Sequence, residues 1–270
     1  MEPMLKDKVA IVTGSATGIG AACAVQLAGQ GCRVVINYSK SEQDAMETAE
    51  ACRRAGAEAI VCQADVSRDE DCAAMVQRTM GEWGRVDILV NNAGTTKFAN
   101  HKDLNALTAE DFQGIYATNV IGAYQMVKAV APVMEKQFDE GNGPSGSVVN
   151  ISSIAGAAGI GSSIAYAASK GAFNTMTLSL ARSQGPFMRV NAVCPGFVGT
   201  RWFRDRFGEE SFKMIVESNA KSSPLKRAGT PDDIAGAVMF FALPWSKHIT
   251  GEILLVDAGA HLDLTPLTAR

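Results

Sequence analysis

The stretch Val9-Ala10-Ile11-Val12-Thr13-Gly14-Ser15-Ala16-Thr17-Gly18-Ile19-Gly20 joins an apolar run to three glycines near the start of the chain. Residues 9–13 predict a buried strand, and the glycines lead directly into a predicted helix. Glycines in such a turn let the backbone approach a phosphate, whose charge then meets the N-terminus of the helix. The stretch therefore predicts a strand–turn–helix unit suited to the phosphates of a nucleotide.

Short β-branched runs alternate with longer helical segments through the rest of the chain, which is typical of β–α–β units in a parallel sheet. Further strands are predicted at residues 33–38, 58–63, 86–91, 147–151, 189–193 and 253–256. No Pro/Ser-rich linker or fixed-period repeat divides residues 1–270, so we expect one domain of the α/β class. The expected fold is a single-domain, doubly wound Rossmann fold with a seven-stranded parallel sheet and helices on both faces.

Helices are predicted between these strands, and several have recognisable ends. Ser67 and Glu70 match the sequence pattern of a capping box, and Ser41 and Thr108 are placed as N-caps. Pro231 suits the first turn of the last helix. The predicted helices cover residues 42–55, 72–83, 108–137, 164–183 and 232–243.

The composition argues against several classes of function. The chain has 270 residues, 47% hydrophobic and 20% charged, with a net charge of −3. Nucleic acids and anionic membranes need a dense basic face, so neither partner is expected. Six cysteines without a Cys-x-x-Cys pair and only three histidines predict no metal site. Scattered cysteines, a start unlike a signal peptide and no apolar run near the ~20 residues of a membrane span indicate a cytoplasmic protein.

Further motifs follow the glycine loop in a fixed order, most of them at the ends of predicted strands. They are Asn91-Asn92-Ala93-Gly94 after the fourth strand, Asn119 in the long helix, Ser153 after the fifth strand, Tyr166 and Lys170 as a Tyr-x-x-x-Lys pair, and Pro195-Gly196 with Thr200 after the sixth strand. In this order and spacing the chain resembles the short-chain dehydrogenase/reductase family over nearly its whole length. The resemblance implies a nicotinamide cofactor and an NAD(P)-binding Rossmann domain over residues 1–270.

Tyr166 and Lys170 lie four residues apart and therefore share one face of a helix. An ammonium beside a phenol favours the phenolate, so we expect Lys170 to lower the pKa of Tyr166. Such a tyrosine can give a proton to a carbonyl oxygen or take one from an alcohol while a nicotinamide exchanges hydride with the carbon. Ser153 would hydrogen-bond the same oxygen. The family resemblance implies that Lys170 also binds the nicotinamide ribose, and that Asn119, the fourth catalytic residue, holds a water.

The same resemblance assigns the residues that would bind the cofactor. They are Gly14, Ala16, Thr17, Gly18, Ile19 and Gly20 in the glycine loop, Asn37, Tyr38 and Ser39 at the second strand, Asp65 and Val66 after the third, Asn92, Ala93 and Gly94 after the fourth, Tyr166 and Lys170, and Pro195, Gly196, Val198 and Thr200 after the sixth. Asp65 would bond the adenine amino group.

The end of the second strand bears on the choice between NAD and NADP. Enzymes that prefer NAD usually place an acid there to bind the ribose diol. This chain has Asn37-Tyr38-Ser39-Lys40-Ser41, with no carboxylate to repel a 2′-phosphate. Thr17 stands where many NADP-selective relatives carry an arginine, so Lys40 and the two serine hydroxyls would have to bind the phosphate. NADP(H) is favoured, and NAD(H) stays open.

The substrate side is less determined. At about residues 199–223 the family has a mobile flap, and here Trp202, Phe203 and Phe207 would either shape an apolar pocket or only pack the segment against the domain. Lys97 would either attract an anionic substrate or lie in solvent. Both pairs of interpretations remain open at this point.

By resemblance, the chain groups with 3-oxoacyl-carrier-protein reductases and with sugar and alcohol dehydrogenases. Carrier-protein reductases dock an acidic partner on basic residues, whereas residues 139–144 here are acidic, and Arg182 and Arg189 are the nearest basic candidates. We therefore expect a free small-molecule ketone, aldehyde or secondary alcohol as substrate. The alternatives are a 3-oxoacyl-carrier-protein reductase and a catalytically silent nucleotide-binding sensor or scaffold. The family resemblance also implies a homotetramer, formed through the helices that carry Asn119 and Tyr166.

Overall fold

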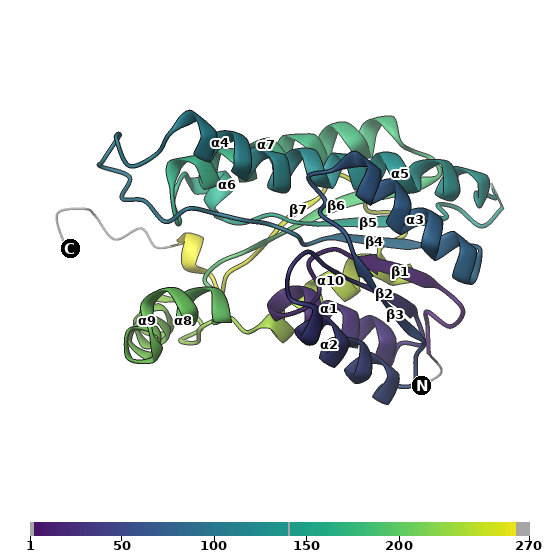
Figure 1. Cartoon of the computed structure of the whole chain (residues 1–270), viewed down its shortest axis with the longest axis horizontal. Helices are drawn as coiled ribbons and strands as arrows, with labels where there is room; N and C mark the ends of the chain where they lie inside the picture. Colours follow the sequence, from purple (N-terminus) through teal and green to yellow (C-terminus); the bar gives the residue numbers. More distant parts are fainter. Residues whose placement is uncertain (1–2, 140, 263–270) are drawn as a thin grey trace.

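The seven strands form one parallel sheet in the order β3-β2-β1-β4-β5-β6-β7, in a computed structural model that describes residues 3–139 and 141–262 (Figure 1). The strands are β1 (Val9–Val12), β2 (Arg33–Tyr38), β3 (Ala59–Gln63), β4 (Ile88–Asn91), β5 (Gly146–Ile151), β6 (Met188–Pro195) and β7 (Ile253–Val256). β1 lies at the centre, where Ala10 pairs with Val34 on one side and with Ile88 on the other. The predicted single-domain, doubly wound α/β fold is confirmed, and each predicted strand is present, β2 and β7 with the predicted ends and the others with shifted ends.

Helices cover both faces of this sheet (Figure 1). The helical elements are α1 (Gly18–Gly29), α2 (Glu42–Arg54), α3 (Asp69–Trp83), α4 (Ala109–Tyr116), η1 (Ala117–Gly122), α5 (Ala123–Lys136), α6 (Ala155–Ala158), α7 (Ile164–Ser183), α8 (Arg201–Phe207), α9 (Glu209–Ser222), α10 (Pro231–Ala242), η2 (Pro244–Ser246) and η3 (Ala260–Leu262). α1, α2 and α10 pack on one face, and α3, α5 and α7 on the other. Within the described residues, no helix combines the length and the apolar character needed to cross a bilayer.

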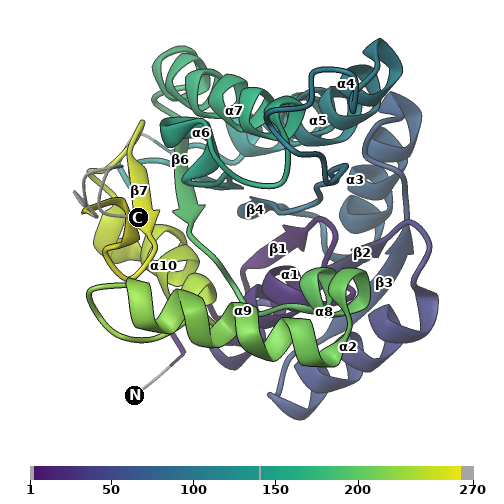
Figure 2. The ribbon, with the colours of Figure 1, turned by 90° about the vertical axis from the view of Figure 1, so that its left-hand side faces the viewer.

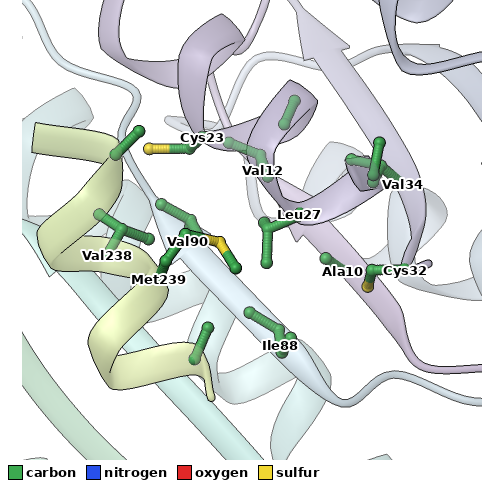
Figure 3. Packing of buried hydrophobic residues seen from close by; sticks show 14 of the residues in the cluster. Ala10, Val12, Cys23, Leu27, Cys32, Val34, Ile88, Val90, Val238 and Met239 are labelled. Carbon is green, nitrogen blue, oxygen red and sulfur yellow. The ribbon is translucent and has the colours of Figure 1, made fainter. Parts of the chain in front are cut away.

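Alternation along each strand divides the core into two layers. Ala10 and Val12 of β1 face the layer under α1 and α10, whereas Ile11 faces the layer under α3 and α5. This period of two arises because successive strand side chains point to opposite faces. In Figure 3, Leu27 of α1 and Val238 of α10 lie in the first layer with the side chains of the central strands. The strands are therefore buried on both faces, as their unbroken apolar sequences predict.

One of the three predicted helix caps forms and two do not, and a further cap forms at Thr230. Thr108 caps α4 and exchanges hydrogen bonds with Asp111 in a capping box, and Thr230 does the same ahead of Pro231 in α10. The capping box predicted at Ser67 is wrong, because the Ser67 hydroxyl donates to Asp65 at 2.7 Å and α3 begins after Arg68. Ser41 occupies the N-cap position of α2 but makes no side-chain cap.

The predicted long helix from Thr108 is interrupted in its middle. A π-helical segment, η1, separates α4 from α5 and carries Asn119, whose side chain is fully buried. Segments of this kind insert an extra residue into the helix and turn the neighbouring side chains to new directions. The interruption therefore sets where Asn119 points.

The strand order reverses between β1 and β4, and the loops after these two strands diverge there. In doubly wound sheets, ligands bind at such a point, outside the carboxyl ends of the strands. The glycine loop follows β1 and the Asn92–Gly94 turn follows β4. The fold therefore brings together the two predicted motifs that lie furthest toward the N-terminus.

Candidate active site

One cavity of about 1260 Å³ lies at the carboxyl ends of the strands. Its walls come from the loops after the central strands, from the start of α7 and from the flap helices α8 and α9. Figure 2 views the molecule from this end, with α8 and α9 on the side of α1 and α2, and α6 and α7 on the opposite side. The predicted flap at residues 199–223 therefore borders the cavity as two helices.

The three glycines of the loop after β1 are needed for different structural reasons. Gly14 and Gly18 both adopt a positive φ, near +60°, which side chains rarely tolerate. A Cβ on Gly20 would lie 2.5 Å from Asn92 Nδ2 and 2.6 Å from the Gly14 carbonyl oxygen. Gly20 is thus required for close packing of α1 against the neighbouring loop, and it does not line the cavity.

Hydrogen bonds hold the glycine loop to the loop after β4. Asn92 Nδ2 donates to the carbonyls of Thr13 and Gly14, at 3.0 and 2.9 Å. The Thr13 hydroxyl accepts from the amides of Asn92 and Ala93, both at 3.0 Å. The two loops therefore form one preorganised floor at the switch point of the sheet.

Asn37 at the end of β2 also stabilises this floor. Its Oδ1 accepts from the Gly14 amide at 2.9 Å, and its Nδ2 donates to the Ala64 carbonyl at 3.0 Å. Both ends of the amide are therefore used inside the protein, and the side chain is only 2% exposed. Although Asn37 borders the cavity, its amide has an internal structural role.

Most of the predicted cofactor residues border this one cavity. The exceptions are Ala16, Gly20 and Tyr38, of which Tyr38 is packed in the core. Alternation explains Tyr38, because it follows Asn37 on the opposite face of the strand. Ser39, Lys40 and Ser41, beyond the strand, do border the cavity. The sequence prediction thus included three residues that the fold directs elsewhere.

Ser153, Tyr166 and Lys170 also line the cavity. Ser163 caps α7 by accepting from the Tyr166 amide at 3.2 Å, which places the tyrosine in the first turn. Tyr166 keeps part of its surface open to the cavity, and burial raises its pKa to about 12, while the neighbouring Ser153 hydroxyl acts in the opposite direction. The phenol is therefore protonated at neutral pH.

Lys170 lies one turn further along α7, buried between two aromatic rings. Its Nζ donates to the Ile151 carbonyl at 2.7 Å and lies 5.7 Å from the centre of the Tyr166 ring. Burial lowers the pKa of this lysine to about 8. Burial is the main cause of the raised pKa of Tyr166, so the pKa lies above its ordinary value and not below it as expected from the neighbouring lysine.

Asn119 lies behind the cavity wall and not on its surface. Its Oδ1 accepts from the Thr95 amide at 2.7 Å, and its Nδ2 donates to the Thr95 carbonyl and the Ser169 hydroxyl, both at 3.0 Å. A Cβ on Gly94 would lie 3.4 Å from Asn119 Oδ1 and 3.9 Å from Lys170 Nζ. The absence of a side chain at Gly94 therefore leaves space between the asparagine and the lysine.

An aromatic cluster borders the substrate side of the cavity. Phe98 packs edge-on against Phe203 and Phe207 of α8, with ring centres 6.0 and 5.3 Å apart. Trp202 meets the Tyr166 ring edge-on at 6.3 Å. Of the two interpretations of the flap aromatics, the structure supports the one in which they shape an apolar pocket.

The basic residues considered for anion or partner binding have other contacts. Lys97 pairs with Asp111 at 2.6 Å and does not border the cavity. Arg189 is 7% exposed and donates to the carbonyls of Phe241 and Ile249, so its proposed help in docking a carrier protein is a prediction that the structure overturns. Only Arg182 of the two arginines is exposed.

The sequence alone did not predict that Phe98 and Arg201 line the cavity. Phe98 meets α8 across 105 and 109 residues, and Arg201 pairs with Asp44 across 157 residues. Neither pair belongs to a local motif, so no spacing in the sequence could reveal it. For Arg201, a basic residue directly after the predicted Thr200 was the only available signal.

The nicotinamide dinucleotide expected from the sequence fits this cavity. Thr17 is the N-cap of α1 without a side-chain bond to the first turn, so that end is open toward a phosphate. Gly18 leaves room beside it, since the nearest atom to a Cβ there would be a Thr200 methyl at 3.7 Å. Within the described residues, no group of three His, Cys, Asp or Glu side chains is placed to hold a metal.

The sequence is similar to a family model and to two proteins that are all described as reductases. A family model described as enoyl-(acyl carrier protein) reductase matches residues 14–261. A ketoacyl reductase of the granaticin polyketide synthase of Streptomyces violaceoruber is 43% identical over 254 residues, covering 94% of this chain and 96% of that protein. A 3-oxoacyl-[acyl-carrier-protein] reductase of Synechocystis sp. is 35% identical over 259 residues, covering 94% and 97%.

A solved structure agrees with these relatives. A crystal structure described as a short-chain dehydrogenase/reductase from Burkholderia xenovorans superposes with a TM-score of 0.86 at 39% sequence identity. The similarity covers 94% of this chain and 98% of that one. The likeness therefore extends over the sheet, the cavity and the flap together.

Proposed function

The chain belongs to the short-chain dehydrogenase/reductase family, and from that premise we propose that it is an NADP(H)-dependent reductase of small apolar ketones, with Tyr166 as general acid/base. As a member of this family it is an oxidoreductase acting on CH–OH groups. The observation that carries the finer proposal is that Tyr166, Ser153 and Lys170 border one cavity together with an apolar aromatic wall.

The side chains would act on the carbonyl oxygen of the substrate. The cofactor, when bound, supplies the hydride. Tyr166 holds its proton at neutral pH because burial raises its pKa to about 12, and it would donate that proton to the oxygen. Ser153 would hydrogen-bond the same oxygen as negative charge develops on it. A protonated tyrosine is the form that the reductive step requires.

Lys170 and Asn119 would support the tyrosine from behind. The Lys170 ammonium, held by the Ile151 carbonyl, lies near Gly94, where it would meet the nicotinamide ribose. With a pKa near 8, it is charged at neutral pH and can release a proton at little cost. Asn119 fixes Thr95 on the substrate side of the cavity. Lys170 would therefore act beside the tyrosine in the cavity, and Asn119 would act as a positioning residue.

NADP(H) is the proposed cofactor because of the charge around the far end of the cavity. Ser39, Lys40 and Ser41 border it where the adenosine ribose would lie, and Asp65 lies further along the same wall. The Ser67 hydroxyl and amide bind Asp65 and lower its pKa, so its carboxylate remains ionised for the adenine amino group. A lysine and two hydroxyls, without a free acid in that loop, favour a 2′-phosphate.

A carrier-bound 3-oxoacyl thioester is the second candidate substrate. The names of two relatives favour it, since one is named for ketoacyl reduction and the other for 3-oxoacyl-[acyl-carrier-protein] reduction. Against it, Asp139 lies at the edge where an acidic carrier would approach, and Arg189 is buried. The free ketone is therefore proposed first.

We also infer a cytoplasmic homotetramer. All six cysteines are free and buried, which suits a reducing compartment. On the outer side of η1 and α5, Ile121 and Tyr124 are 48% and 50% exposed, and Leu178 of α7 is 45% exposed. Exposed large apolar side chains on η1, α5 and α7 support packing against a second subunit.

The proposed function is tested by binding and turnover on the purified chain. NADPH should raise the melting temperature more than NADH at equal concentration, and NADPH oxidation should follow addition of an aryl ketone. A rate with a 3-oxoacyl carrier protein more than about tenfold above that of its short thioester would favour the second candidate instead. Tight NADPH binding without turnover on any carbonyl would indicate the silent nucleotide binder.

A further inference from the structure

The first residue of α8 in the flap forms an ion pair with the helix that follows β2. Arg201 opens α8, and its Nη1 and Nη2 donate to the two carboxylate oxygens of Asp44, at 3.1 and 2.7 Å. Asp44 lies in the first turn of α2, 157 residues earlier. The adjoining Thr200 packs beside Gly18 of the glycine loop. In Figure 2, α8 accordingly lies in front of α1 and beside α2.

This ion pair lies beside the loop where the adenosine ribose would bind. Arg201, Lys40 and Ser41 all border the main cavity. Lys40, Ser41, Glu42 and Asp44 also border a smaller hollow of about 590 Å³ at the first turn of α2. Because two residues are shared, the hollow and the cavity adjoin. The Arg201 guanidinium therefore adds a second cation to the side of the cavity that already holds Lys40.

The pair also changes the charge that Asp44 presents. A carboxylate at the start of α2 could accept hydrogen bonds from a ribose diol, or repel a 2′-phosphate. Here both carboxylate oxygens of Asp44 accept hydrogen bonds from Arg201. The guanidinium therefore neutralises the negative charge of Asp44 and occupies the side of the carboxylate that faces it. A guanidinium has five N–H groups, so Arg201 keeps three for another acceptor. Asp44 thus orients Arg201 without exhausting it.

We propose that Arg201 selects the cofactor: together with Lys40 it binds the 2′-phosphate of NADP(H), and Asp44 is the positioning residue that orients it. This inference rests on the proposed use of NADP(H). Arginine suits the role because its planar fork matches carboxylate and phosphate geometry, and the two bonds to Asp44 fix its orientation beforehand. An arginine supplied from the flap also replaces the one that the glycine loop lacks at Thr17.

The position of Arg201 connects cofactor selection to the substrate pocket. The next residue, Trp202, packs edge-on against Tyr166, and Phe203 packs against Phe98. A phosphate bound to Arg201 holds the start of α8, and with it the aromatic wall over the catalytic tyrosine. The 2′-phosphate of NADP(H) would add a contact to the start of α8 that NAD(H) cannot make.

The test measures binding of the adenosine end alone, without turnover. Adenosine 2′,5′-bisphosphate and adenosine 5′-monophosphate differ by the 2′-phosphate, and calorimetry compares them on the wild type, Arg201→Ala and Arg204→Ala. Arg204 lies on the same helix with the same 44% side-chain exposure, but it does not border the cavity. We expect Arg201→Ala to weaken the bisphosphate about tenfold, as loss of a charge-assisted hydrogen-bonded contact does, with the monophosphate changed less than about threefold. Arg204→Ala should bind both as the wild type does.

The variant Asp44→Asn tests whether Asp44 orients Arg201 for the 2′-phosphate. The variant keeps the arginine but leaves only one of the two oxygen acceptors that orient it, so the preference for the bisphosphate should fall, by less than in Arg201→Ala. An equal loss of both ligands in Arg201→Ala would overturn the proposal, and an unchanged preference in Asp44→Asn would overturn the positioning role of Asp44. A wild type that binds the two ligands equally would instead refute the proposed NADP(H) use itself. A wild-type preference retained in Arg201→Ala would refute only the role of Arg201.

Discussion

The ammonium of Lys170 is held by the main-chain carbonyl of Ile151, the last residue of β5, at a distance of 2.7 Å. A backbone carbonyl neutralises less charge than a carboxylate would, so the lysine remains a poorly compensated buried cation. Its lowered pKa, about 8, follows from this placement. The buried ammonium of Lys170 therefore lowers the stability of the folded protein.

Lys170→Met should make the protein more stable at pH 7 while abolishing turnover. The folded-state pKa of Lys170 is about 8 against an ordinary 10.5, so folding disfavours the proton, and the penalty is fully present below pH 8. A pKa shift of this size corresponds to a penalty of about 3 kcal/mol in the free energy of folding. Loss of the bond to Ile151 offsets about 1 kcal/mol or more of it. The net gain in the free energy of unfolding at pH 7 should be about 1–2 kcal/mol, measured by urea titration.

The sign of the pH dependence provides the check. The penalty in the wild type disappears as pH rises from 8 to 10.5, because the unfolded lysine then also loses its proton. The stability difference between Lys170→Met and the wild type should therefore vanish or reverse by about pH 10. Lys136→Met, at the exposed end of α5, should show no such change. A constant difference from pH 7 to pH 10 would show that Lys170 is not a buried cation.

Tyr166→Phe should lower kcat for ketone reduction by about 10²- to 10⁴-fold, because the substitution removes only the hydroxyl that donates the proton. Affinity for NADPH and the melting temperature should stay close to wild type, since the ring and its contact with Trp202 remain. Tyr124→Phe on α5, where the ring is half exposed, is the matched control. Turnover above a tenth of wild type in Tyr166→Phe would require another proton donor.

Trp202→Ala should discriminate between substrates by their size. An edge-on aromatic contact is worth about 0.5–1.5 kcal/mol beyond the buried area. Loss of the wall beside Tyr166 should lower kcat/KM for an aryl ketone about tenfold, and for a short aliphatic ketone less than about threefold. Trp245→Ala, 65% exposed in η2, serves as control. If both ketones lost the same factor, Trp202 would hold the flap in place and would not select the substrate.

Gly20→Ala and Gly29→Ala form a matched pair in α1. A Cβ at Gly20 would overlap Asn92 Nδ2 and the Gly14 carbonyl, whereas nothing lies within 4 Å of a Cβ at Gly29. Gly20→Ala should therefore destabilise the protein by about 1–3 kcal/mol, as overpacking does. Gly29→Ala should stabilise it by up to about 1 kcal/mol through helix propensity. Urea titration measures both, and a neutral Gly20→Ala would mean that the two loops can separate without cost.

The sequence by itself determined the order of the elements and most of the cavity lining. Strand positions such as β2 and β7, and the whole of α7, were predicted with their observed ends. These features depend on the alternation of apolar residues and on spacings of a few residues, which are local properties of the chain. Tyr166 and Lys170 belong to the same category, since four residues along a helix always bring two side chains to one face.

The tertiary structure alone decided how those residues are used. It turned Asn119 inward through a π-helical segment, directed the Asn37 amide to Gly14 and Ala64, and buried Arg189 under the end of α10. It also raised the pKa of Tyr166 where charge proximity alone predicted a decrease. Each outcome depends on desolvation or on partners distant in sequence, and the pair of Arg201 and Asp44 is the clearest case. Such contacts exist only once the helices have packed on the sheet, so no local pattern encodes them.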